Sequence, residues 1–101
     1  MSETERSYAR EKFEQAVANM AIDRGTLEKR IYSAWLTFHT VKPGAFEEDE
    51  ALAEAWSDLQ RMLKDAEAGT NSLERGLNKI EEAEVDRLAD QIVLVAGRLR
   101  D

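Results

Sequence analysis

The hydrophobic positions of the chain fall into segments with the spacing of α-helices. The most apolar segment is Thr26–Val41, where large side chains recur every three or four residues. Its apolar side consists of Leu27, Ile31, Ala34, Trp35, Phe38 and Val41. Tyr32, Leu36 and His39 widen that side to about half of the circumference, so we expect other helices to cover this segment from more than one direction.

Three further segments show the same spacing. We predict a first helix over Thr4–Asp23, ahead of Gly25, and a third over Glu48–Ala68, ahead of Gly69. The remaining apolar positions predict a long last helix over Ser72–Leu99. Short connections favour antiparallel packing of consecutive helices.

The connection after the central helix contains the chain's single proline. Proline disfavours the helical conformation at Lys42, so Pro43 and Gly44 are expected to end this helix. Phe46 follows closely and is expected to plug the end of the bundle before the third helix begins.

The last helix contains one polar residue on its apolar side. Glu84 falls on that side, and a buried, unpaired carboxylate is costly. The helix must break within Glu81–Glu84, let Glu84 reach solvent, or pair it with a basic residue; we favour a bend or break. The sequence therefore predicts an all-α, antiparallel four-helix bundle, a single domain over residues 1–101, with the fourth helix long and broken near Glu81–Glu84.

Composition narrows the class of protein. The 101 residues are 43% hydrophobic and 35% charged, which is typical of a soluble globular protein. Absence of cysteine excludes disulfides, a thiolate nucleophile and cysteine-based zinc sites. The polar start and the lack of a long apolar run favour a cytoplasmic location without membrane contact. With 21 acidic and 14 basic residues the net charge is −7, and no basic face is apparent, so we expect no direct nucleic-acid binding.

The sequence contains few candidate catalytic residues. His39 is the only histidine, and no cysteine, nucleophile elbow or second metal-ligating residue accompanies it at a recognisable spacing. We expect His39 to pack beside Trp35 and Tyr32. The sequence thus predicts no catalytic residues, no metal or other cofactor, and no enzyme activity.

An acidic run at the start of the third helix is the most unusual feature. Its members are Glu47, Glu48, Asp49, Glu50, Glu54 and Asp58. A calcium loop is excluded, because an EF-hand needs a central glycine. The run either imitates a phosphate backbone and binds a basic groove, or is a solvated helix start where the dipole favours acids. Arg61, three residues after Asp58, neutralises part of it.

The apolar run near the end of the chain gives a second candidate surface. Val93 and Leu94 point away from the side of the last helix that faces the bundle. Either this helix is buried on all sides, or both residues contact a second subunit, which would make the protein a homodimer through its last helix. Trp35 and Trp56, in contrast, lie on apolar sides and are expected in the core.

The segment Lys12–Phe46 also carries a loose pattern of residue types. The matching residues are Lys12, Phe13, Ala16, Val17, Gly25, Arg30, Ile31, Ala34, Pro43 and Phe46. It resembles a pattern of short uncharacterised bacterial and phage all-helical proteins, and covers about a third of the chain. The resemblance implies a small bacterial or phage helical protein, and it implies no activity.

These observations favour a small acidic interaction or regulatory protein that acts by binding another protein. The alternative is an acidic nucleic-acid mimic, for example a phage-encoded inhibitor of a CRISPR-type bacterial defence complex. The candidate partner-binding residues are the six acids of the run together with Val93 and Leu94.

Overall fold

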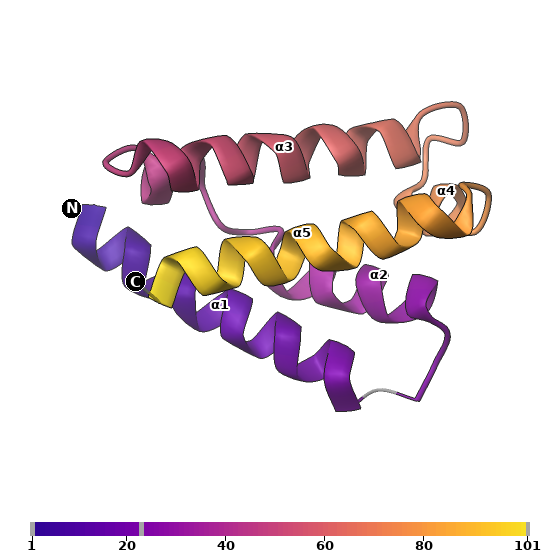
Figure 1. Cartoon of the computed structure of the whole chain (residues 1–101), viewed down its shortest axis with the longest axis horizontal. Coiled ribbons are helices and arrows are strands. Elements are labelled where there is room, and N and C mark those ends of the chain that lie inside the picture. The colour runs from indigo at the N-terminus through magenta and orange to yellow at the C-terminus, as the bar shows by residue number, and fades with distance from the viewer. Residues whose placement is uncertain (1, 23, 101) are drawn as a thin grey trace.

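The computed structural model describes residues 2–22 and 24–100, and these form helices, turns and loops without any strand. The all-α prediction is confirmed. In chain order the elements are α1 (Ser2–Ile22), α2 (Leu27–Phe38), the 3₁₀ turn η1 (Pro43–Phe46), α3 (Glu50–Glu67), α4 (Leu73–Leu77) and α5 (Glu82–Arg100), as Figure 1 shows.

The helices pack around α5. In Figure 1, α1 and α2 form an antiparallel hairpin, and α5 lies between α1 and α3 and runs antiparallel to both. The hairpin is closed by Arg30 of α2, whose Nη1 donates to the Met20 carbonyl near the end of α1 (3.0 Å). Both chain ends lie at the same end of the molecule. One helix therefore holds the two halves of the fold together.

Four aromatic rings form the centre of the core. Phe13 of α1 stacks on Phe38 of α2, and Phe46 of η1 stacks on Trp56 of α3, with 4.5 Å between ring centroids in each pair. Trp56 also meets Phe13 and Phe38 edge to face, at 6.0 and 6.5 Å. The expected burial of Trp56 and the plugging role of Phe46 are confirmed, since they are 8% and 1% exposed.

The central helix is shorter than the sequence predicts. It begins after Thr26, whose hydroxyl accepts from the Lys29 N–H, and it ends at Phe38 rather than at Val41. The Val41 N–H instead donates to the Phe38 carbonyl in a turn (2.9 Å), and Val41 is still buried. A turn and a helix both bring a residue back to the core after three positions, so apolar spacing alone did not distinguish them.

Trp35 is less buried than predicted. It is packed against the core but only half-buried, and its ring is stacked between Tyr32 (5.9 Å) and His39 (4.9 Å). It borders a shallow hollow between α3 and the start of α4. Because α4 is only five residues long, it does not cover this part of α2 as a continuous last helix would.

The predicted break in the last helix is confirmed, and it begins before Glu81. The chain leaves the helical conformation after Leu77, and α5 starts at Glu82. Glu84 lies in the first turn of α5 and is exposed, where the helix dipole favours an acid. The break and the solvent exposure of Glu84 therefore occur together.

A close backbone contact fixes α4 against α3. Gly76 is buried, and a Cβ at this position would overlap the Ala66 carbonyl of α3. Ser72 caps α4 by accepting from the Arg75 N–H. Only glycine allows the two backbones to approach this closely.

The aromatic core predicts unequal roles for the two tryptophans. Trp56→Ala should lower the free energy of unfolding by about 3–5 kcal/mol, the range for large aromatic side chains removed from cores. Trp35→Ala should cost less, under about 2 kcal/mol, because the ring is only partly buried. Chemical denaturation of both variants would measure the difference. Equal losses of unfolding free energy in the two variants would contradict the conclusion that Trp56 lies at the centre of the core.

Candidate functional site

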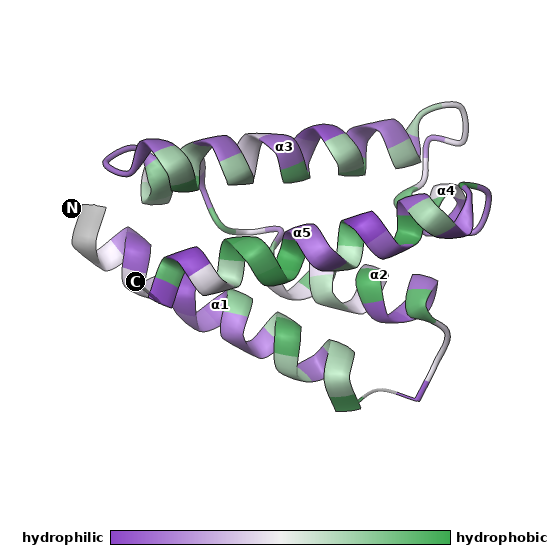
Figure 2. Cartoon of the chain, in the orientation of Figure 1, coloured by the Kyte–Doolittle hydropathy of each residue, from purple (hydrophilic) through white to green (hydrophobic). Residues whose placement is uncertain are grey.

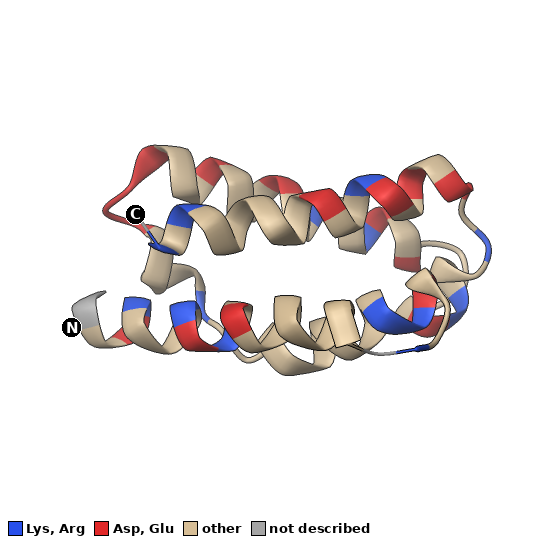
Figure 3. Cartoon of the chain, turned by 60° about the horizontal axis from the view of Figure 1, so that its bottom comes forward, with Lys and Arg blue, Asp and Glu red and all other residues tan. Residues whose placement is uncertain are grey.

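The six acids of the run lie along the start and the outer side of α3. Figure 3 shows that acidic residues recur along this helix. Glu47, Glu48, Glu50 and Glu54 are exposed, whereas Asp49 and Asp58 are half-buried. The six side chains therefore do not share one environment.

Asp49 has a structural role. It is the N-cap of α3, and its Oδ1 accepts from the Leu52 N–H (3.1 Å). Its Oδ2 lies 4.0 Å from Nη1 of Arg6, so the same carboxylate also contacts α1. A capping carboxylate satisfies a backbone donor that the helix leaves unpaired.

Asp58 is also engaged within the molecule. Its Oδ1 accepts from Nη2 of Arg61, one turn further along α3 (2.9 Å). Glu47, Glu50 and Glu54, in contrast, form no ion pair with a described residue. The unneutralised part of the acidic run is therefore smaller than the sequence indicates.

Val93 and Leu94 are exposed at the middle of α5, at 49% and 42%. Burial of α5 on all sides is thus excluded within one subunit. Figure 2 shows the hydrophobic stretch at mid-length of this helix. The other large apolar side chains exposed in the described chain, Tyr8, Ile22 and Leu36, belong to α1 and α2.

The fold brings the acidic run and the exposed apolar residues together. A shallow groove between α3 and α5 is lined by Ala51, Glu54, Ala55, Asp58, Gln91, Leu94 and Arg98. At its floor the Gln91 side-chain amide donates to the Ala55 carbonyl of α3 (2.8 Å), which joins the two helices. We call this the α3–α5 groove.

Several residues of this surface were not predicted from the sequence. Gln91 and Arg98 complete the α3–α5 groove: Gln91 is half-buried and bonded to α3, and Arg98 is exposed at the edge of the groove. Recognising them required knowledge that α3 and α5 are neighbours. The seven-residue recurrence of Gln91 and Arg98 placed them on one side of the helix, but no sequence signal identified which helix they face.

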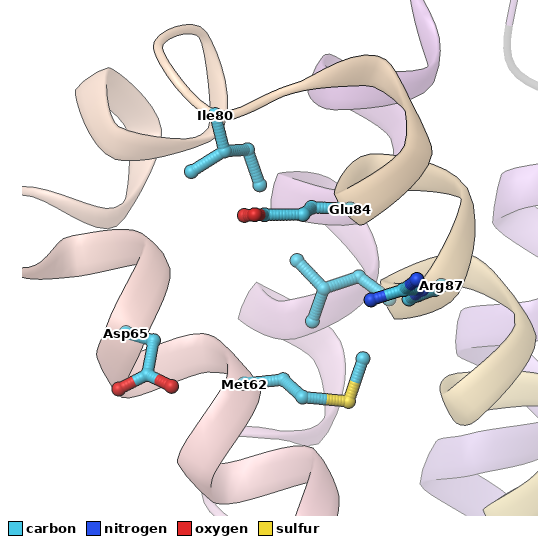
Figure 4. A pocket seen from close by; sticks show the side chains of 6 residues that line it. Met62, Asp65, Ile80, Glu84 and Arg87 are labelled. Atoms are coloured by element: carbon cyan, nitrogen blue, oxygen red, sulfur yellow. The ribbon is translucent and has the colours of Figure 1, made fainter.

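A second hollow lies between the other ends of α3 and α5. Figure 4 shows that α3 contributes Met62 and Asp65 and that α5 contributes Glu84 and Arg87, with Ile80 above them. Its volume of about 270 Å³ is below the roughly 300–1,000 Å³ typical of small-molecule sites. No ion pair among the described residues joins Arg87 to either acid, and we assign no ligand to this hollow.

The environment of His39 agrees with a packing role. Its ring lies 4.9 Å from that of Trp35, as predicted, and its Nδ1 is 2.8 Å from the Leu36 carbonyl oxygen, to which it can donate. Among the residues that the structure describes, no group of three or more His, Asp or Glu side chains is placed to hold a metal ion. None of the described helices combines the length and apolarity needed to cross a bilayer.

Comparison of the chain with protein-family models, curated proteins and solved structures finds no match. The resemblance of Lys12–Phe46 to short bacterial and phage helical proteins therefore stays a hypothesis.

The glycines of α4 and α5 predict opposite responses to an added methyl group. Gly97 of α5 is exposed, and a Cβ there would meet no atom within 4 Å, in contrast to Gly76. Gly97→Ala should leave stability unchanged or raise it by up to about 1 kcal/mol, the difference in helix propensity. Gly76→Ala should destabilise the fold by more than about 2 kcal/mol, because backbone must shift. Thermal and chemical unfolding would test both, and a tolerated Gly76→Ala would refute the close contact.

Proposed function

We propose that this protein acts by binding another protein through the α3–α5 groove and the exposed middle of α5. The observation that carries the proposal is the position of Leu94. It is exposed, it lies beside Val93, and it borders the same groove as Glu54 and Asp58. An apolar centre with charged side chains around it is the usual composition of a protein–protein interface.

The charge of the surface adds to this support. The chain carries net charge −7, and the exposed acids of α3 lie next to the groove. A partner with basic residues at the edge of its binding surface would be steered toward this side of the molecule. The partner that fits this description is a protein with an apolar patch bordered by lysine or arginine.

The nucleic-acid mimic draws less support from the described residues. Asp49 caps α3 and contacts Arg6, and Asp58 pairs with Arg61. A mimic needs several carboxylates free to replace phosphates, and two of the six acids are already engaged. We therefore favour an interface with an apolar centre over a purely acidic one.

Site-specific photo-crosslinking tests the proposal directly. A photoreactive side chain at position 94 should crosslink to a protein in a bacterial lysate, whereas the same group at Gln15, exposed on α1, should not. Mass spectrometry of the products would identify what is bound. Absence of any protein crosslink from position 94, or equal crosslinking from both positions, would refute binding at this surface.

The acids of α3 should accelerate association with the captured partner. Changing Glu50, Glu54 and Asp58 to Gln, Gln and Asn removes three negative charges with little change in shape. We expect the association rate at low salt to fall about tenfold and the difference to shrink near 1 M salt, where the Debye length is roughly 3 Å. Stopped-flow or surface-based kinetics would measure the association rate at low and at high salt.

A matched control variant separates local from general charge effects. Changing Glu11, Glu67 and Glu74 to Gln removes the same charge from exposed positions outside the α3–α5 groove. This variant should bind nearly as fast as the wild type. If the two triple variants are slowed equally, net charge rather than the acidic run steers the partner.

A further inference from the structure

The outer side of α5 carries charged residues without partners inside the subunit. The exposed residues on this side, which we call the α5 face, are Glu82, Ala83, Asp86, Arg87, Asp90, Val93, Leu94, Gly97, Arg98 and Arg100. The opposite side of α5 is buried against the other helices. None of its charged side chains forms an ion pair with a described residue, although α1 and α3 both contain such pairs. Acids predominate before the two exposed apolar side chains, with Arg87 the exception, and arginines follow them.

The charges differ in sign on the two sides of the apolar pair. Asp86 lies seven residues before Val93, and Arg100 lies seven residues after it. Asp90 lies four residues before Leu94, and Arg98 lies four residues after it. At the rise of an α-helix these separations are about 10.5 Å and 6 Å along the axis, acid on one side and base on the other.

Opposite charge at the two ends of one face favours antiparallel pairing with an identical helix. If two α5 helices lie antiparallel about a twofold axis between Val93 and Leu94, each Asp86 comes within one residue's rise, about 1.5 Å, of the level of the other copy's Arg100. Each Asp90 likewise comes within one residue's rise of the level of the other copy's Arg98. At 3.6 residues per turn, Asp86 and Arg100 lie about 40° apart around the helix and Asp90 and Arg98 about 80° apart, so Arg98 sits toward the α3 edge of the contact. A parallel pair would place like charges level with one another.

Gly97 is a second, independent observation on the same face. Glycine in a helix interior is less favourable than alanine, and no atom within 4 Å of a Cβ at Gly97 requires its absence. The residue lies one turn after Val93 and Leu94, on the exposed side. Close approach of a second backbone is a common reason for glycine at such a position. Within one subunit Gly97 has no packing role, and an opposing helix would supply one.

We infer that the α5 face binds a second copy of this chain, with the two α5 helices antiparallel about a twofold axis near Val93 and Leu94. This inference rests on the proposed function, since it names the partner that the exposed middle of α5 takes. A twofold contact of this kind uses the same surface on both subunits. The acids of α3 lie along its edge, where Leu94 borders the α3–α5 groove.

Complementary charge reversal tests whether these four charges lie in the contact. One variant carries Asp86→Arg with Asp90→Arg, and the other carries Arg98→Glu with Arg100→Glu. Each alone should raise the dissociation constant of the homodimer by about tenfold or more, because all four predicted pairs become like-charged. An equimolar mixture should restore association as a heterodimer, since every pair is again opposite in sign. Sedimentation equilibrium of the two purified variants and of their mixture measures the three dissociation constants.

Two control variants accompany this experiment. Glu11→Arg with Glu74→Arg makes the same change in net charge as Asp86→Arg with Asp90→Arg, at exposed positions on α1 and α4, and it should leave self-association unchanged. Gly97→Leu adds a side chain into open space within the subunit, so it should keep the fold and weaken the dimer. Circular dichroism measures whether each variant is folded. If a charge-reversed variant does not fold, the dissociation constant of the Gly97→Leu dimer tests the α5 contact in its place.

The outcomes separate this inference from the proposed function. A wild type that stays monomeric at the highest concentrations sedimentation can reach overturns the homodimer. In that case a crosslink from position 94 to a different protein still supports the proposed function. A dimer that survives both charge reversals and Gly97→Leu overturns the antiparallel α5 contact.

Discussion

The stacking of Phe46 on Trp56 connects the two halves of this fold. Phe13 and Phe38 form their own stacked pair within the α1–α2 hairpin, and Trp56 meets both of them edge to face. The chain has to leave α2 early for Phe46 to reach Trp56, because η1 must turn back over the end of the bundle before α3 starts. Once Trp56 is placed, the register of α3 follows, and with it the positions of the acids on its outer side.

Much of this fold could be predicted from apolar spacing, because each helix buries residues that recur every three or four positions. The exact end of α2 could not, since Val41 reaches the core equally well from a turn. The exposure of Trp35 depended on a non-local fact, namely that the segment covering it is the five-residue α4. The start of α5 was predictable in outline, because Glu84 could not remain on a buried side without a partner.

The candidate site was predicted in parts but not as a unit. The acidic run and the pair Val93 and Leu94 were visible as separate features, about forty residues apart in sequence. Their meeting across α3 and α5 depends on which helices are neighbours, and amphipathic spacing does not encode that choice. Charge counting also overstated the acidic run, because it does not show that Asp49 caps a helix or that Asp58 pairs with Arg61.

The two glycines that contrast in this structure place different limits on how the sequence can vary. At position 76 the backbone of α3 occupies the space of a side chain, so any residue other than glycine requires the backbone to shift. At position 97 the subunit itself imposes no such limit. If the α5 face binds a second copy, relatives that assemble in the same way should retain glycine at 97, and relatives that do not are free to replace it.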